Sequence, residues 1–182
     1  MADERSESDV NSWRQTVRDG DAFMWQISLK LPLLERSHID SQYDPDEEST
    51  AGPIDEFGGD GKAGSVTEEQ GKAIDYFIEN LERLYPKILK AIATYSEEFR
   101  PDWVNIDPML ADRVVPQNMT TKQVEQRVNF RRVYIPPKTR DGIAYVELYG
   151  ECTWDRDHGF NVVTHRDRIV EVCQQGTGWV DK

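Results

Sequence analysis

Histidine and cysteine are scarce in this chain of 182 residues, which contains three histidines and two cysteines. Three histidines exclude a His-rich metal centre, and two cysteines fall short of the structural zinc patterns. The sequence has no run of about 18 apolar residues, which excludes a membrane-spanning helix. Its first residues, Met1 to Arg5, lack the basic region and the apolar stretch of a secretory signal. We therefore expect a cytoplasmic protein that makes no contact with a membrane.

An excess of basic charge is missing as well, because the formal net charge is -12. Residues 1–61 carry 15 acidic and 5 basic side chains, whereas residues 62–182 carry 19 and 17. This balance argues against nucleic acid as a partner, since binding a phosphate backbone needs a basic face. It favours a protein partner with a basic surface, although acidity that serves only solubility is the alternative. The acidic contact candidates in the first third are Asp44, Asp46, Glu47 and Glu48.

Aromatic residues are plentiful, with five Trp, seven Tyr and six Phe, and they indicate a packed interior. The length suits one domain. We expect a flexible lead over residues 1–19, a folded domain over residues 20–175 and a tail over residues 176–182. Glycines interleaved with acids predict a mobile loop over residues 40–64, and its spacing does not fit a calcium-binding EF-hand loop.

Hydrophobic periodicity predicts a strand near the start of the domain. Apolar residues alternate with polar ones from Trp25 to Leu31, which is typical of a strand with one buried face. Pro32 ends this strand or marks it as a sheet edge. An edge strand could pair with a second copy of the chain, so the oligomeric state stays open.

A helical block follows, because Thr67 and Gln70 fit a capping box and apolar residues then recur at helical spacing. Pro86 has no amide hydrogen, so we expect this helix to stop or kink near Tyr85 and a second helix to run to Phe99. Residues 101–119 predict an irregular connection with one short helical turn. A threonine at 120 or 121 is expected to cap a further short helix.

The last third predicts strands over residues 130–135, 142–154, 160–164 and 169–173, separated by short turns. Sequential strands with short connections pair as neighbours, so we predict an α+β fold in which an antiparallel meander sheet is packed on one face by two or three helices. Cys152 and Cys173 would then lie two strands apart, about 9.5 Å. That separation is too large for a disulfide, so we expect two free thiols.

The segment W-D-R-D-H-G, residues 154–159, is predicted to form a five-residue hairpin loop over residues 155–159. Its chemistry leaves three interpretations open. The loop is structural, or Trp154, Asp155, Asp157 and His158 contact a protein partner. In the third interpretation, Asp155, Asp157 and His158 form a metal or acid–base site. That site would need further ligands from elsewhere in the chain.

The runs at residues 144–148, 152–163 and 168–172 resemble a bacterial family of domains of unknown function. That family has a strand, then W-D-x-E-H-G, an apolar strand, a short turn and a final strand. This chain has Asp157 where the family usually has Glu, and Phe160 where Leu is common. The resemblance covers about residues 20–175. It implies a small domain without enzymatic activity and, because some relatives neighbour immunity genes of polymorphic toxins, an immunity or interaction protein.

The sequence shows no nucleophile elbow, phosphate-binding loop or zinc-binding helix motif. We therefore expect a non-enzymatic protein-binding domain without a cofactor. An immunity-type protein that neutralises a toxin domain with a basic surface is one such domain. The alternative is a metal-assisted hydrolase that uses Asp155, Asp157 and His158.

Overall fold

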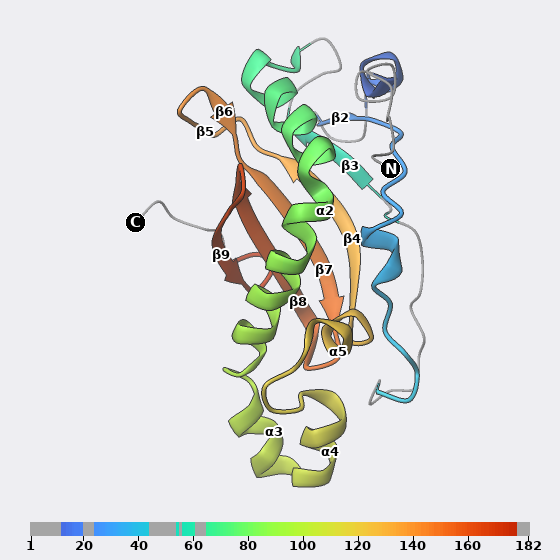
Figure 1. Ribbon diagram of the computed structural model, residues 1–182, viewed down its shortest axis with the longest axis vertical. Helices are drawn as coiled ribbons and strands as arrows, with labels where there is room; N and C mark the ends of the chain where they lie inside the picture. Colours follow the sequence, from blue (N-terminus) through green and yellow to red (C-terminus); the bar gives the residue numbers. More distant parts are fainter. Residues whose placement is uncertain (1–11, 20–23, 44–53, 55, 61–64, 178–182) are drawn as a thin grey trace, which may run out of the picture.

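The computed structural model describes residues 12–19, 24–43, 54, 56–60 and 65–177. Over these residues the chain forms a large sheet, and the long helix α2 (Glu68–Ser96) crosses one of its faces (Figure 1). The sheet order is β1-β2-β3-β4-β7-β8-β9. The strands are β1 (Arg18–Asp19), β2 (Met24–Gln26), β3 (Glu56–Asp60), β4 (Val128–Ile135), β7 (Val146–Cys152), β8 (Asp155–His165) and β9 (Arg168–Cys173).

The remaining elements lie around this two-layer body. They are η1 (Ser12–Thr16), η2 (Leu34–Arg36), α3 (Arg100–Ile106), α4 (Pro108–Val114), α5 (Thr121–Glu125), and a small hairpin of β5 (Thr139–Arg140) and β6 (Ile143–Ala144). Sheet and helices together confirm the predicted α+β class. The core lies between α2 and the sheet, where buried apolar side chains of both layers meet. Those from α2 include Ile74, Phe77, Leu81, Leu84, Ile88 and Ile92.

The predicted meander is confirmed, because β4, β7, β8 and β9 pair as antiparallel neighbours. The strand predicted over residues 142–154 is divided in two, since β6 pairs with β5 before β7 enters the large sheet. Cys152 on β7 and Cys173 on β9 are separated by β8 and are free thiols, as expected.

The loop predicted over residues 40–64 contains a strand, so that prediction is wrong for residues 56–60. β3 lies between β2 and β4, antiparallel to β2 and parallel to β4. Two glycines allow β3 to fit between its neighbours. A Cβ on Gly58 would lie 2.3 Å from the Trp25 carbonyl oxygen, and a Cβ on Gly59 would lie 2.3 Å from the Ile135 carbonyl oxygen. Residues 44–53, 55 and 61–64 lie outside the described residues, and with them Asp44, Asp46, Glu47 and Glu48.

The flexible lead predicted over residues 1–19 is wrong for residues 12–19, which pack on the fold. Trp13 is 2% exposed, and its indole nitrogen donates to Asp75 Oδ1 at 2.8 Å. The Arg14 guanidinium lies over the Trp13 ring and binds Asp75 Oδ2 at 2.7 Å. A buried tryptophan and a bidentate contact to α2 therefore attach this segment to the helix.

The N-terminal strand is shorter than predicted, since β2 ends at Gln26. Burial still follows the expected alternation, with Trp25, Ile27 and Leu31 buried and Leu29 half-buried. Beyond β2 the Ile27 amide still donates to the Phe57 carbonyl oxygen of β3 at 2.9 Å.

Helix α2 continues through Pro86 and ends at Ser96, so a stop near Tyr85, one of the two predicted outcomes, is wrong, and no second helix runs to Phe99 in this described stretch. Thr67 and Gln70 form the predicted capping box at its start. Pro86 has no N–H group to donate to the Glu82 carbonyl oxygen one turn earlier. Both residues are exposed, so water can donate to that carbonyl instead. The apolar residues before and after Pro86 share one face, and their burial against the sheet holds the helix together.

Two short helices replace the irregular connection predicted over residues 101–119. Asp107 ends α3 and caps α4, because its carboxylate accepts from the amides of Met109 and Leu110. In Figure 1 both helices lie at one end of the molecule, beyond the C-terminal end of α2. The helix predicted after residue 120 is confirmed as α5, with Thr120 as its cap.

Candidate functional site

The W-D-R-D-H-G segment forms a bulged strand instead of the predicted five-residue loop. Thr153 and Trp154 make the turn, and β8 begins at Asp155. The pairing Cys152 with Asp155 is followed by Gly150 with Phe160, so residues 156–159 bulge out of the ladder. Gly159 supplies the positive φ of +61° that closes the bulge.

Trp154 is buried, with 3% of its surface exposed, so the structure does not offer its side chain to a partner. Its carbonyl oxygen accepts a hydrogen bond of 3.0 Å from the indole nitrogen of Trp103 on α3. The turn of the β7–β8 hairpin is thereby joined to α3. This contact makes the hairpin and the two short helices neighbours.

Asp155 is also turned inward, and its side chain is 9% exposed. Oδ1 accepts the His158 amide at 3.2 Å and lies 3.0 Å from His158 Nδ1, while Oδ2 accepts the Gln174 side-chain amide at 2.7 Å. Both oxygens therefore fix the bulge and the segment after β9. Asp157 and His158 are the two exposed members of the motif, with 59% of the His158 side chain accessible.

The residues of the alternative metal site are not gathered into one. The described part of the chain has no group of three or more His, Cys, Asp or Glu side chains that could hold a metal ion. The thiol next to the motif is no better suited to chemistry, because burial raises the pKa of Cys152 and keeps it protonated at neutral pH.

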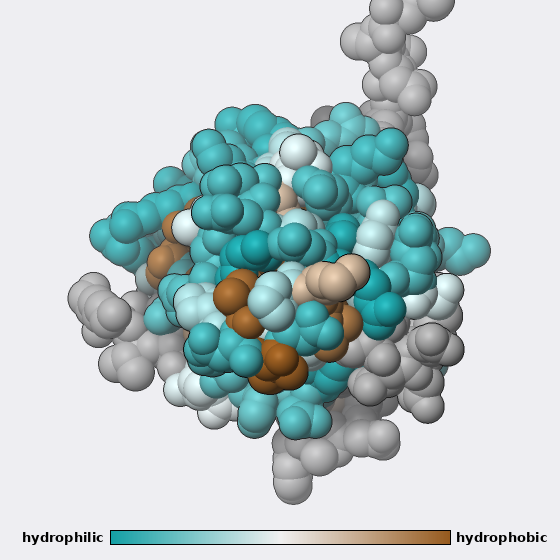
Figure 2. Space-filling model, turned by 90° about the horizontal axis from the view of Figure 1, so that it is seen from below, coloured by the Kyte–Doolittle hydropathy of each residue, from teal (hydrophilic) through white to brown (hydrophobic). Residues whose placement is uncertain are grey.

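The most exposed apolar side chains lie where α3 meets α4. Of the four large apolar side chains exposed in the described residues, three belong to this stretch: Val104 at 38%, Ile106 at 72% and Met109 at 84%. We call these three residues the apolar corner. Figure 2 looks onto this end of the molecule and shows apolar side chains gathered within a hydrophilic surface.

Sequence reasoning missed the apolar corner, because residues 101–119 have no helical or strand period that would set an outer face apart from an inner one. The available signal was local: Ile106 and Met109 flank an Asp-Pro pair that starts a helix. Apolar residues at such a bend cannot all turn inward, since the bend itself projects away from the core.

The surface around the apolar corner is acidic. Residues 97–113 hold five acidic and two basic side chains. One basic residue, Arg100, is engaged by Asp112 at 2.6 Å and by the Val115 carbonyl oxygen at 2.6 Å. Asp102 is exposed, and it forms no ion pair or side-chain hydrogen bond with the described residues.

A polar cluster lies on the sheet face away from α2. Glu147, 5% exposed, accepts from the Tyr149 hydroxyl and, at 3.1 Å, from the Asn161 side-chain amide. Tyr134 packs edge-on against Tyr149 with their ring centroids 6.5 Å apart. Burial raises the pKa of both tyrosines, so their hydroxyls stay neutral donors. The cluster links β4, β7 and β8, and its contacts stabilise the sheet.

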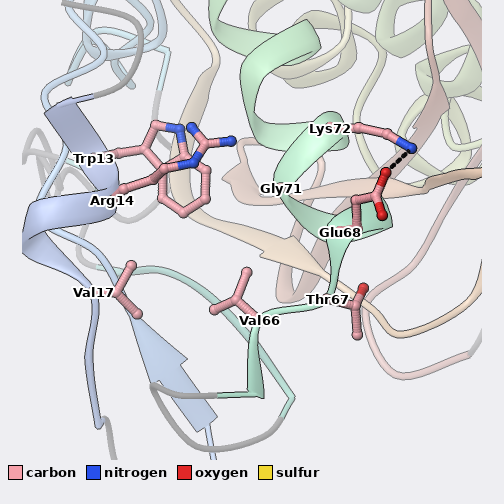
Figure 3. A pocket seen from close by; sticks show the side chains of 8 residues that line it. All are labelled: Trp13, Arg14, Val17, Val66, Thr67, Glu68, Gly71 and Lys72. Atoms are coloured by element: carbon pink, nitrogen blue, oxygen red, sulfur yellow. Dashed lines mark ion pairs between the residues drawn. The ribbon is translucent and has the colours of Figure 1, made fainter.

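A cavity of about 560 Å³ opens between η1 and the start of α2 (Figure 3). Trp13, Arg14 and Val17 line one side, and Figure 3 shows the pair of Glu68 and Lys72 on the other. Arg14 binds Asp75, and Glu68 binds Lys72, so the charges that line the cavity are already neutralised within the fold.

Among the comparisons with known proteins, the one with family models finds a match. No curated protein and no solved structure matches the chain. In the described residues, none of the helices has the length and apolar character needed to cross a bilayer. A family model described as Domain of unknown function (DUF6985) matches residues 46–179, which is most of the sequence. The chain therefore belongs to this family.

Proposed function

We propose that the chain is a protein-binding domain without catalytic activity, and that it contacts its partner through the apolar corner and the neighbouring hairpin. The observation that carries the proposal is the exposure of Ile106 and Met109 at the bend between α3 and α4. Apolar side chains clustered within a polar surface are typical of protein interaction sites. The exposed Asp157 and His158 lie on the hairpin that Trp103 joins to α3, and we assign them to the contact as well.

Neutralising a basic toxin domain is one function of this kind. An inhibitor needs shape and charge complementarity and no reacting groups. The protonated thiol of Cys152 agrees with a role that needs no nucleophile, whereas Trp154 and Asp155 are turned inward and leave Asp157 and His158 as the contact candidates of the motif. The bacterial origin and the immunity role implied by the sequence resemblance belong to this proposal.

A site-specific crosslink tests the proposal. The photoreactive residue benzoylphenylalanine replaces Met109 in one full-length variant and Val170, an exposed apolar residue on β9, in the other. Both variants are irradiated in extract of the source cells, at low and high salt. We expect a protein adduct at position 109 and none at position 170. The same adducts at both positions, or none at either, would contradict the proposal.

A further inference from the structure

Resting on the proposed function, we propose that the apolar corner receives a basic amphipathic segment of the partner protein. Such a segment carries an apolar stripe flanked by lysine or arginine. Its stripe would cover Ile106 and Met109, and its cations would lie against the carboxylates that surround them. The proposed function names the contact surface, and this inference names the chemical character of the segment that binds there.

The apolar part of the argument comes from the position of the side chains. Ile106 ends α3 and Met109 lies in the first turn of α4, so both project from the bend between the helices. Trp103 and Leu110, on the same two helices, are only half-buried. Methionine adapts its shape to different partners at low energetic cost, which suits a recognition surface. Water is released when such a surface is covered.

The charge part comes from the residues around the corner. The stretch 97–113 has a net charge of -3, and the whole chain has a net charge of -12. Asp102 and Glu98 are exposed and make no ion pair with the described residues. A cationic segment is attracted by this field and oriented by it before contact.

The same charges argue against two other occupants. A second copy of the chain would bring an equal acidic surface against this one, and like charges across an interface cost binding energy. An anionic membrane would be repelled for the same reason. Charge complementarity therefore selects a basic polypeptide as the occupant.

A peptide titration tests the inference with the full chain. The probe is a synthetic leucine–lysine peptide of about four helical turns, with its leucines on one face. The same peptide with glutamate in place of lysine is the comparison. Methionine methyl NMR reports the site, since Met109 is 84% exposed and Met119 is 7% exposed. We expect the lysine peptide to shift the Met109 signal in a saturable way and the glutamate peptide to leave it unchanged.

Matched variants locate the binding energy. Ile106→Ser with Met109→Ser should weaken calorimetric binding at least about 10-fold, whereas Val170→Ser should change it less than about twofold. Asp102→Asn should weaken binding about threefold at low salt and have no effect at high salt. Glu79→Gln, an exposed carboxylate on α2, is the control and should leave affinity unchanged. Unchanged circular dichroism shows that each variant is folded.

Several results would overturn the inference. The first is equal affinity for the glutamate peptide and the lysine peptide, and the second is binding of the lysine peptide without a shift of the Met109 methyl signal. The third is a dimer of the chain that dissociates in the double serine variant. The fourth is a shift of the Met109 signal when phosphatidylserine vesicles are added. Failure here and failure of the proposed function can be told apart. If benzoylphenylalanine at position 109 captures a partner but the lysine peptide does not bind, only the partner's basic character is wrong. If position 109 captures no protein and the lysine peptide does not bind, both proposals fail.

Discussion

Gly159 combines two constraints in a single residue of the hairpin. Its φ is +61°, which favours glycine, and a Cβ there would lie 2.2 Å from the Gly150 carbonyl oxygen. Gly142 has a similar φ of +72° but no atom within 4 Å of an added Cβ. The two positions therefore separate backbone strain from steric overlap.

Alanine substitution should show this difference. We expect Gly159→Ala to lower the free energy of unfolding by about 3 kcal/mol, from strain and overpacking together. Gly142→Ala should lower it by about 1 kcal/mol, from strain alone. Urea unfolding followed by circular dichroism measures both. Equal losses would mean that the backbone relaxes around residue 159.

The two polar residues of the motif are expected to differ in their effect on stability. Asp155→Ala leaves the Gln174 amide and the His158 backbone amide without their acceptor, and should cost about 2 kcal/mol of unfolding free energy. His158→Ala removes an exposed ring and should change stability by less than about 0.5 kcal/mol. Thermal melts of both variants measure this. A large loss for His158→Ala would show that the ring does more than rest on Asp155.

At the scale of elements, Pro86 weakens the helix that carries much of the core. Pro86→Ala restores an amide donor to the exposed Glu82 carbonyl, and should raise the free energy of unfolding by about 2 kcal/mol. Lys90→Ala, an exposed substitution one turn later, should change it by less than about 0.5 kcal/mol. Urea midpoints test the pair. A loss of stability in Pro86→Ala would mean that the two halves of α2 need a bend at the proline to fit the sheet.

Elements whose signals are local could be predicted from the sequence. The capping box of Thr67 and the apolar period of α2 lie within one segment, and the meander strands follow each other with short turns. β3 could not be predicted, because Gly58 and Gly59 are needed only to avoid overlap with Trp25 and Ile135, and both of these residues are remote in the chain.

The site candidates at the motif stay a prediction, and the connection itself was misplaced. The turn between β7 and β8 is made by Thr153 and Trp154, and the rest of the motif lies in β8, where Asp157 and His158 are exposed. Trp154 is buried, and its carbonyl oxygen accepts from Trp103 on α3, in a stretch where the sequence predicted only one short helical turn. Periodicity reports one face of one element, and it carries no information on which distant element will cover that face.

For the whole molecule, buried tyrosines set the response to alkali. Burial raises the pKa of Tyr85 and Tyr95 above their ordinary value of about 10. Above pH 10 the unfolded chain loses these protons while the native chain keeps them. The free energy of unfolding should therefore begin to fall above about pH 8.5, where Cys152 ionises only in the unfolded chain, and should fall more steeply above pH 10, by about a further 1.4 kcal/mol per pH unit for each tyrosine. Urea midpoints between pH 8 and about pH 11 measure the slope.

Tyr85→Phe provides the control for this slope. The variant should be less stable at neutral pH, because the Tyr85 hydroxyl bridges Ser37 and Glu125. Its stability should nevertheless decline less steeply above pH 10, by about 1.4 kcal/mol per pH unit. An unchanged slope would mean that Tyr85 ionises equally easily in the folded and unfolded chains.

The family match begins at residue 46, yet the sheet continues before it, since residues 18–19 and 24–26 form β1 and β2. Trp13, Trp25 and Leu34 are buried in the common core. The segment before residue 46 is therefore structural in this chain and extends the sheet beyond the matched region.

The parallel pairing of β3 with β4 also sets an order of events during synthesis. Helices α2, α3, α4 and α5 all lie between these strands in the chain, so β3 can pair only with the short strand β2 until β4 has left the ribosome. Antiparallel neighbours β4, β7, β8 and β9 need only short connections and can assemble first. The N-terminal residues, although made first, would then join last, and Trp25 and Phe57 would stay open to chaperones until the second half of the chain has folded.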